Sequence, residues 1–282
     1  MTPLRIPRWA PVCIRLGLNL MRRDFQKYAP IAIALFVGRS GVERWRVRLI
    51  RASYFYFRYL DDVADGERAC GSAPGLFLDR QSSQWCAGPA AVEARDEPAI
   101  LLNFIWTEFV RRNFPLPRAR FLALRIIEGL RFDLERRPRR RLVRRAELDE
   151  YYAKVVLAPS CLAHLILDAH AAPEALEEIS GLIGRLQSLR DLHADWVAGV
   201  INIPLEDLEQ MPPRQDMANW RQRETGRGAM RLRTLWEQWP SHADERSLAI
   251  MRPVVHALLR GATRTCARQS AMFIGENVLA RC

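Results

Sequence analysis

The chain has 282 residues, of which 49% are hydrophobic, and its formal net charge is +11 at pH 7. That apolar fraction is enough for a sizeable core, and the length allows one large domain or two small ones. The six cysteines form no CxxC pair, which excludes the spacing of a zinc finger and indicates reduced thiols in a cytoplasmic protein.

Neither a membrane span nor a secretion signal is expected. The longest uninterrupted apolar run, residues 29–38, is too short to cross a bilayer and contains Pro30. The apolar stretch at the N-terminus is interrupted by Arg15 and lacks a clear cleavage site. Only Lys27 and Lys154 are lysines, so the basic charge is almost all arginine, whose guanidinium group suits phosphate-like anions.

Helical periodicity recurs along the chain and strand signals are nearly absent, so we expect a single all-α domain over residues 1–282. The expected helices cover residues 12–37, 42–65, 97–113, 118–136, 146–170, 173–198, 219–239, 244–260 and 264–279. Pro30 and Pro159 are expected to bend their helices, because proline lacks an amide hydrogen. Residues 66–98 show no period and are expected to form a long connection with one short helix.

The stretch from Tyr54 to Asp65 ends an apolar, aromatic run with three carboxylates in five residues. In a helix, four of its side chains fall on one face: Tyr54, Arg58, Asp61 and Asp65. Three acids beside one base repel each other unless a cation lies among them, and ligands made only of oxygen favour magnesium. The alternative is a solvated helix end with acids placed by chance, because a DDxxD string alone is a weak signal.

A second expected helix repeats this pattern. Gln187, Asp191 and Asp195 are four residues apart and share one helix face, with Arg190 beside them. The preceding residues are apolar enough to lie in the core, so carboxylates again project from an otherwise buried helix. Two such helices facing each other would form a cavity with acids on both walls, which suits magnesium ions that bind a diphosphate. His193 points away from this face and is expected at the helix surface.

With these motifs, the chain resembles the squalene/phytoene synthase family of head-to-head isoprenoid synthases. Three blocks carry the resemblance, and their order and spacing are right across about 150 residues. The blocks are Tyr54-x-x-x-Arg58-x-x-Asp61-Asp62-x-x-Asp65; Ile127-Glu128-Gly129 through Asp133-Leu134 to Glu147-Leu148-x-x-Tyr151; and Leu189-Arg190-Asp191-x-x-x-Asp195 with Gly199 and Ile203-Pro204. Together the blocks are specific, although each alone is not.

The resemblance implies an isoprenoid synthase fold, a helical bundle around one central cavity. It implies that Mg²⁺ is held by Asp61, Asp62, Asp65, Asp191 and Asp195. Those ions would bind the diphosphate of an allylic isoprenyl substrate, of dimethylallyl to farnesyl length, and assist its departure together with Arg58. The remaining candidates for contacts with substrate or cation are Tyr54, Phe57, Tyr151, Gln187 and Arg190. Phe57 fits a place in the core equally well, because most aromatic residues on helices are core residues.

The sequence departs from the family pattern beside the second motif. The family usually has glutamine where Gly184 stands, asparagine where Gln187 stands, and an arginine within the segment Gly199–Pro204. In the family, small residues usually follow the tyrosine that corresponds to Tyr151 and lies in the cavity; here they are replaced over Val155–Ser160. An apolar run at 31–35 replaces a Ser-x-Ser-Phe block. Because the metal-binding half is intact and several accessory polar positions are missing, the sequence favours one diphosphate donor and a different second substrate. An aromatic acceptor, such as a carbazole in a natural-product pathway, would fit.

Three other functions stay open. The first is head-to-head condensation of two prenyl diphosphates to a squalene- or phytoene-like product, and the second is a terpene cyclase. The third is a binding module, in which the arginine cluster 136–145 contacts nucleic acid or an anionic membrane surface. A solvated loop is the default for a cluster beside Pro138, so nucleic acid is not expected as a partner. The cluster could instead attract an anionic substrate or give peripheral membrane contact.

Overall fold

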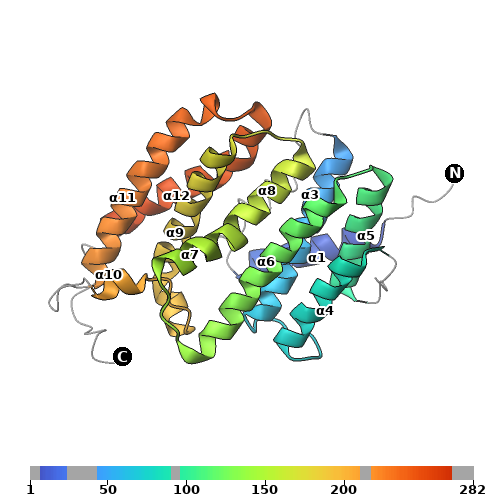
Figure 1. Cartoon of the computed structure of the whole chain (residues 1–282), viewed down its shortest axis with the longest axis horizontal. Helices are drawn as coiled ribbons and strands as arrows, with labels where there is room; N and C mark the ends of the chain where they lie inside the picture. The colour runs from blue at the N-terminus through green and yellow to red at the C-terminus, as the bar shows by residue number, and fades with distance from the viewer. Residues whose placement is uncertain (1–6, 24–42, 90–95, 210–216, 269–282) are drawn as a thin grey trace. The chain divides into compact units, whose positions relative to one another are not determined.

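Figure 1 shows the computed structural model of the chain, which describes residues 7–23, 43–89, 96–209 and 217–268. The described residues form helices and their connections, and extended pairing among them is limited to two isolated bridges. The all-α class expected from the sequence is therefore confirmed. None of the described helices is long and apolar enough to cross a membrane. Four of the cysteines are free thiols: Cys13, Cys70, Cys86 and Cys161.

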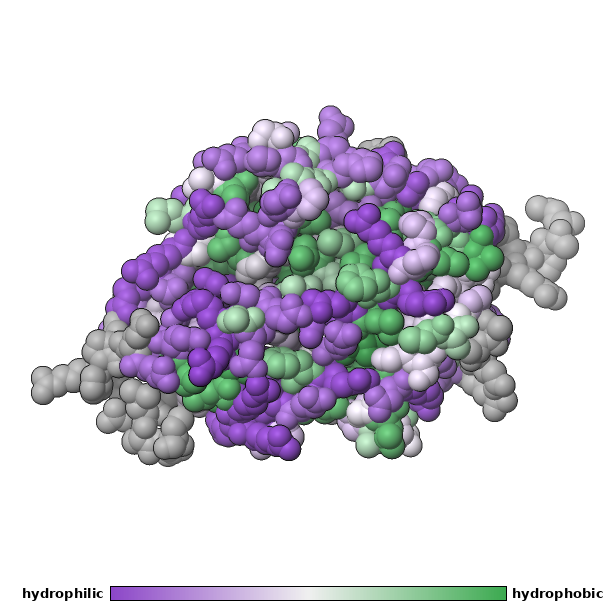
Figure 2. Space-filling view, viewed as in Figure 1, coloured by the Kyte–Doolittle hydropathy of each residue, from purple (hydrophilic) through white to green (hydrophobic). Residues whose placement is uncertain are grey.

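The chain divides into two compact units. Unit 1 comprises Met1–Leu134 with Cys161–Asp168, and unit 2 comprises Glu135–Ser160 with Ala169–Cys282. The chain passes from one unit to the other within α6 (Leu116–Arg136) and α8 (Ala158–Leu167). Hydrophilic residues cover most of the face seen in Figure 2, with hydrophobic residues between them.

Unit 1 is organised around α3 (Arg44–Ala64), which packs against α1, α4 and α5. These neighbours are α1 (Trp9–Arg23), α4 (Pro74–Ala87) and α5 (Glu97–Arg111). The hydroxyl of Tyr56 donates to Gln81 Oε1 at 2.9 Å and accepts from Trp85 Nε1 at 3.0 Å. Since all three side chains are buried, these bonds satisfy polar groups that would otherwise oppose the packing of α4 on α3.

Unit 2 is organised around α9 (Pro173–Val197), which packs against α7, α11 and α12. These neighbours are α7 (Arg145–Tyr152), α11 (Met217–Gln238) and α12 (Glu245–Arg268), and a short helix, α10 (Leu205–Glu209), precedes α11. Gly228 allows α11 to approach α9 closely, because a Cβ there would lie 3.0 Å from Leu186 Cδ2. The core of unit 2 therefore lies along the length of α9.

Most of the expected helices are confirmed to within a few residues. The helix expected at 173–198 is α9, and the short helix expected within 66–98 is α4. The separation of residues 244–260 from 264–279 is wrong, since α12 continues without a break from Glu245 to Arg268. Gly261 does not end that helix. The bend expected at Pro30 and the apolar run at 31–35 lie outside the described residues.

The bend expected at Pro159 takes the form of a π-helical turn. Residues Ala153–Leu157 form this turn between α7 and α8, and the amide of Ala158 donates to the carbonyl of Ala153. In a regular α-helix the ring of Pro159 would collide with the carbonyl four residues earlier, and a wider turn avoids that collision. Proline thus changes the helix geometry just after Tyr151 and Tyr152.

Candidate active site

The first acidic site, defined here as Asp61, Asp62 and Asp65, lies at the C-terminal end of α3. Asp65 is the exposed cap residue, and its amide donates to the carbonyl of Asp61 at 2.8 Å. Gly66 follows in a left-handed conformation with φ of +74°, which ends the helix. The negative end of the helix dipole disfavours carboxylates at this position. The site therefore needs positive charge from elsewhere.

Arg58 supplies one such charge from the same helix. Its Nη1 donates to Asp61 Oδ2, and its Nη2 lies 2.6 Å from Asp62 Oδ1. The same Nη2 donates to Glu67 Oε2 at 3.2 Å. The side chain of Asp62 is only 3% exposed, and this guanidinium group is closer to it than that of Arg68, whose Nε lies 3.9 Å from Oδ2.

The pKa of Asp61 is raised to about 7. Loss of water around its carboxyl group is the main cause; Asp65, Asp62 and Asp133 add repulsion, and Arg58 opposes the shift. A carboxyl group in this state still lacks positive charge, even with Arg58 beside it. A divalent cation would supply that charge.

The donor chemistry of the first acidic site fits magnesium, since every candidate ligand atom is a carboxylate oxygen. Across the described residues, no three acidic, histidine or cysteine side chains are close enough together to hold an ion as they stand. In its present arrangement Asp61 is bound to Arg58. A metal ion at this site must therefore compete with the guanidinium group for that carboxylate.

The aromatic candidates on α3 lie in different surroundings. Phe57 stacks against Trp85, with ring centroids 6.3 Å apart and 10° between the planes, and it meets Tyr56 edge-on. Phe57 is thus part of an aromatic cluster between α3 and α4. Tyr54 is half-buried and meets Phe55 edge-on at 5.3 Å. Contact of either ring with a substrate stays a prediction.

The second acidic site, defined here as Gln187, Asp191 and Asp195, lies on the last turns of α9. Arg190 binds Asp191 with two hydrogen bonds, from Nε to Oδ1 at 2.8 Å and from Nη2 to Oδ2 at 2.6 Å. Gln187 is half-buried. His193 is exposed, as expected for a residue on the helix surface.

Asp195 is held by residues that the sequence analysis did not connect with it. Asn202 Nδ2 donates to Asp195 Oδ2 at 3.0 Å, and Arg136 Nη2 donates to Asn202 Oδ1 at 2.5 Å. Arg136 is 1% exposed, and its Nη1 donates to the carbonyl of Ile201 at 3.2 Å. No local spacing in the sequence connects Arg136 with Asp195. Asn202 joins the two residues, and its position depends on the path of the chain after α9.

Two adjacent tyrosines end α7. The guanidinium carbon of Arg136 lies 4.9 Å from the ring centre of Tyr151, within the range of a cation–π contact. Tyr152 is buried, its hydroxyl donates to Ser188 Oγ at 3.2 Å, and burial raises the pKa of that hydroxyl. A Cβ at position 184 would lie 2.6 Å from the ring carbon Cδ1 of Tyr152, so Gly184 leaves the space that this ring fills. The unusual glycine was the sequence signal for Tyr152, which sequence reasoning missed.

The structure therefore places the predicted residues in two groups. Tyr54, Phe57, Arg58 and the first acidic site share α3 in unit 1. Tyr151, Arg190 and the second acidic site belong to α7 and α9 in unit 2. Their roles in binding metal and substrate stay predictions.

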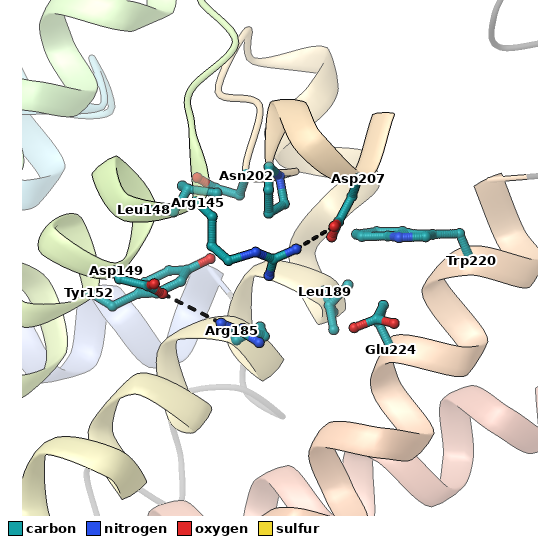
Figure 3. A pocket seen from close by; sticks show the side chains of 11 residues that line it. Arg145, Leu148, Asp149, Tyr152, Arg185, Leu189, Asn202, Asp207, Trp220 and Glu224 are labelled. Atoms are coloured by element: carbon teal, nitrogen blue, oxygen red, sulfur yellow. Dashed lines mark hydrogen bonds and ion pairs between the residues drawn. The ribbon is translucent and has the colours of Figure 1, made fainter. Parts of the chain in front are cut away.

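Unit 2 also contains a pocket beside α9, shown in Figure 3. It encloses about 350 Å³, part of which is open to solvent. Ion pairs join Arg145 to Asp207 and Arg185 to Asp149 within it, and Trp220 stands opposite α7. The pocket is lined by Arg145, Leu148, Asp149, Tyr152, Arg185, Leu189, Asn202, Pro204, Asp207, Trp220 and Glu224. At 3.6 residues per turn, its α9 residues lie on a different face from the second acidic site.

Comparisons with known proteins agree with this arrangement of motifs. The model of the family "Squalene/phytoene synthase" matches residues 43–274. The structure is similar to that of a dehydrosqualene synthase in complex with ligand, with a TM-score of 0.60 and 15% identity, covering 93% of this chain and 86% of the other. It is also similar to squalene synthase HpnC from Alicyclobacillus acidocaldarius, with a TM-score of 0.61 and 19% identity, covering 92% of this chain and 93% of the other. At these identities the likeness shows the fold alone. No curated protein sequence matches the chain significantly.

Proposed function

Since the chain belongs to the squalene/phytoene synthase family, we propose that it is a magnesium-dependent prenyltransferase that joins two allylic isoprenyl diphosphates head to head. The family match covers both acidic sites, and the two similar structures are synthases of this kind by name. These findings support head-to-head condensation better than the aromatic acceptor that the sequence departures favour. Family membership makes the chain a transferase of isoprenoid biosynthesis.

The observation that carries the proposal is the family match over both acidic sites, each of which has carboxylates and an arginine together on one helix. Asp61 keeps a raised pKa although Arg58 contacts it directly. Purely structural ion pairs normally lower the pKa of a carboxyl group, because the partner stabilises its charged form. A further cation beside Asp61 would favour the charged form of its carboxyl group, which is the form that binds metal.

Within this proposal the two acidic sites bind magnesium and diphosphate. Bound Mg²⁺ neutralises the charge that develops on a departing diphosphate. Arg58 and Arg190 each contact a carboxylate in this structure, and either guanidinium group would be able to bind diphosphate oxygens if that carboxylate held metal instead. Tyr54, Gln187 and Tyr151 are the proposed contacts for the rest of the substrate.

The test is incubation of the purified protein with Mg²⁺ and dimethylallyl, geranyl or farnesyl diphosphate alone. Without a reductant, head-to-head condensation of two farnesyl diphosphates that releases both diphosphates gives a C30 hydrocarbon by loss of protons. Asp61→Ala and Asp191→Ala, made separately, should each lower turnover more than about 100-fold, which exceeds the usual cost of losing a partner outside the metal's ligands. Asp79→Ala and Glu178→Ala are the controls, since both acids form ion pairs on α4 and α9 away from these sites. Full turnover in either test variant would contradict the metal assignment.

An aromatic acceptor is the second candidate, and a feature of unit 2 favours it. The ring of Tyr152 fills the space over Gly184, where the family usually has glutamine, so no polar side chain fits there. Val200 and Ile201 are buried apolar residues in the segment that usually carries an arginine. With glycine and apolar residues at these positions, fewer polar side chains near the second acidic site are available to bind a second diphosphate.

The ratio of diphosphate released to product formed separates the two candidates. An aromatic acceptor requires one released diphosphate per product and no product without the acceptor. Carbazole and indole, supplied with each prenyl diphosphate, are suitable probes. A cyclic hydrocarbon formed from one prenyl diphosphate would instead indicate a terpene cyclase.

The arginine cluster 136–145 gives little support to a nucleic-acid-binding module. Arg136 is buried against Asn202, Arg141 pairs with Glu147, and Arg145 pairs with Asp207. Arg140 donates to the carbonyl of Trp196 at 2.9 Å. These arginines bind groups of the protein itself, which leaves fewer of them for phosphates.

A further inference from the structure

We propose that Asn202 and Arg136 are positioning residues of the second acidic site. Asn202 fixes the carboxylate of Asp195 in the orientation in which it binds magnesium, and Arg136 fixes both Asn202 and the ring of Tyr151. This inference rests on the proposed function, because it gives Asp195 a role in binding metal. It gives a role to two residues that the sequence analysis did not assign to metal or substrate.

The amide of Asn202 can act in only one orientation. Its oxygen accepts from the guanidinium group of Arg136, and its nitrogen donates to the carboxylate of Asp195. The reverse orientation would place two donors together on one side and two acceptors together on the other. A cation and a carboxylate on opposite sides therefore lock the amide. Because the bond from Asn202 goes to Oδ2, the two oxygens of the Asp195 carboxylate are no longer equivalent.

Arg136 is costly to bury, and its contacts explain why it is tolerated. It is 1% exposed at the last residue of α6, where the helix dipole favours a positive charge. Its two terminal nitrogens bond to Asn202 and to the carbonyl of Ile201, and its guanidinium carbon lies over the ring of Tyr151. One planar group thus fixes α6, the end of α7 and the segment after α9. A lysine could not make this set of contacts, because its ammonium group is not a planar fork.

The turn after α9 brings Asn202 to this place. Gly199 has φ of +84°, and a Cβ there would lie 2.7 Å from the carbonyl oxygen of Arg137. The amide of Val200 then donates to the carbonyl of Asp195 at 2.8 Å. The turn is therefore packed directly against the end of α6 and tied back to α9. Only glycine permits this close approach without strain.

The position of Arg136 also bears on the missing arginine of the segment Gly199–Pro204. The family usually carries a basic residue within that segment, whereas here its residues 200 and 201 are buried and apolar. Arg136 brings a guanidinium group to the same segment from a different helix. The local charge beside Asp195 is thus supplied although the sequence motif lacks it.

The test measures Mn²⁺ binding to the substrate-free protein by electron paramagnetic resonance, for wild type, Asp195→Ala, Asn202→Ala and the double variant. Losing a hydrogen-bond partner of a metal ligand typically weakens metal affinity about 10- to 100-fold, and we expect a loss in this range for Asn202→Ala. In the double variant, the change at Asn202 should cause no further loss of Mn²⁺ affinity beyond that of Asp195→Ala, because Asn202 acts through Asp195. A role limited to stability would instead give additive losses, or would change the melting temperature with unchanged Mn²⁺ affinity, and either result would overturn the proposal.

Two further variants keep the test decisive if Asn202→Ala does not fold. Asn202→Asp has nearly the same shape and still accepts a hydrogen bond from Arg136, but it presents an acceptor to Asp195 in place of a donor. Its loss of Mn²⁺ affinity must therefore also be non-additive with that of Asp195→Ala. Arg136→Lys should weaken Mn²⁺ binding less than Asn202→Ala does, since it keeps the charge without the planar fork. If Asp195→Ala leaves Mn²⁺ affinity unchanged, the proposed function fails at this residue. If Asp195→Ala weakens binding and the Asn202 variants do not, only the positioning role fails.

Discussion

The two acidic helices obtain their positive charge in different ways. On α3 the cation is local, since Arg58 reaches Asp61 and Asp62 from three and four residues earlier in the same helix. On α9 it is partly distant, since Asp195 depends on Asn202 and on Arg136 at the end of α6. The first arrangement can be read from spacing alone, whereas the second exists only in the folded chain.

Burial differs between the helices as well. The side chain of Asp62 is 3% exposed, whereas that of Asp191 is 31% exposed and its partner Arg190 is 40% exposed. Water therefore screens the pair of Arg190 and Asp191 more than the pair of Arg58 and Asp62. Equal substitutions on the two helices should have unequal effects on stability.

The largest effect is expected for Arg58→Ala. It removes the cation nearest to the buried carboxylate of Asp62. The next cation is Arg68, whose Nε lies 3.9 Å from that carboxylate. Removing one partner of a buried pair should lower the free energy of unfolding by about 3 kcal/mol. Urea unfolding measures this change, with Arg58→Lys as the control that keeps the charge. A change below about 0.5 kcal/mol would mean that Asp62 is better solvated than its burial indicates.

An intermediate effect of opposite sign is expected for Asp61→Asn. The pKa of Asp61 is about 7 in the folded protein and near its ordinary value of 3.8 when unfolded, so the folded state binds more protons between these values. The wild type should therefore lose stability as pH rises from about 4 to about 7. Asp61→Asn avoids this loss.

In the absence of metal, we expect Asp61→Asn to be the more stable protein above pH 7, by about 1 kcal/mol after allowance for solvent screening. The difference should vanish near pH 4. Thermal unfolding in a chelator across this pH range is the measurement, and Asp79→Asn is the control. A difference that does not depend on pH would rule out the ionisation of Asp61 as its cause.

The smallest effect is expected for Arg190→Ala. The pair that it breaks is more exposed than the pair of Arg58 and Asp62, so the free energy of unfolding should fall by about 0.5 kcal/mol or less. If Arg190 binds diphosphate, the KM for the prenyl diphosphate should nevertheless rise. The contrast between unchanged stability and raised KM is what separates α9 from α3. Equal loss of stability for Arg58→Ala and Arg190→Ala would contradict the inference that the two ion pairs differ in burial and screening.

Much of the fold could be predicted from sequence because its helices carry local signals. Pro173 marks the first turn of α9, and Gly66 follows the last residue of the first acidic site. Asp61 and Asp191 were recognisable because a carboxylate repeated on an apolar helix face is a local pattern.

The features that the sequence did not predict depend on contacts between residues that are far apart in the chain. Arg136 belonged to an apparent surface cluster, and nothing in its neighbours indicated that it is buried against Asn202. Tyr152 was overlooked because the ring that fills the space over Gly184 comes from another helix. At α12 the sequence predicted a break between residues 260 and 264 that the structure does not contain. Packing in unit 2 outweighed the low helix propensity of Gly261.

The π-helical turn at Ala153–Leu157 has a consequence for the history and engineering of this chain. Such a turn holds one residue more than the α-helical path that it interrupts. A relative that lacks a residue here, and lacks Pro159, could run straight from α7 into α8. Deleting one residue while replacing that proline should therefore be tolerated by the backbone and should leave the side chains on either side in nearly their present directions, because the wide turn absorbs the extra residue. The turn thus accommodates one additional residue after the tyrosines of α7 without changing the direction of the residues that follow.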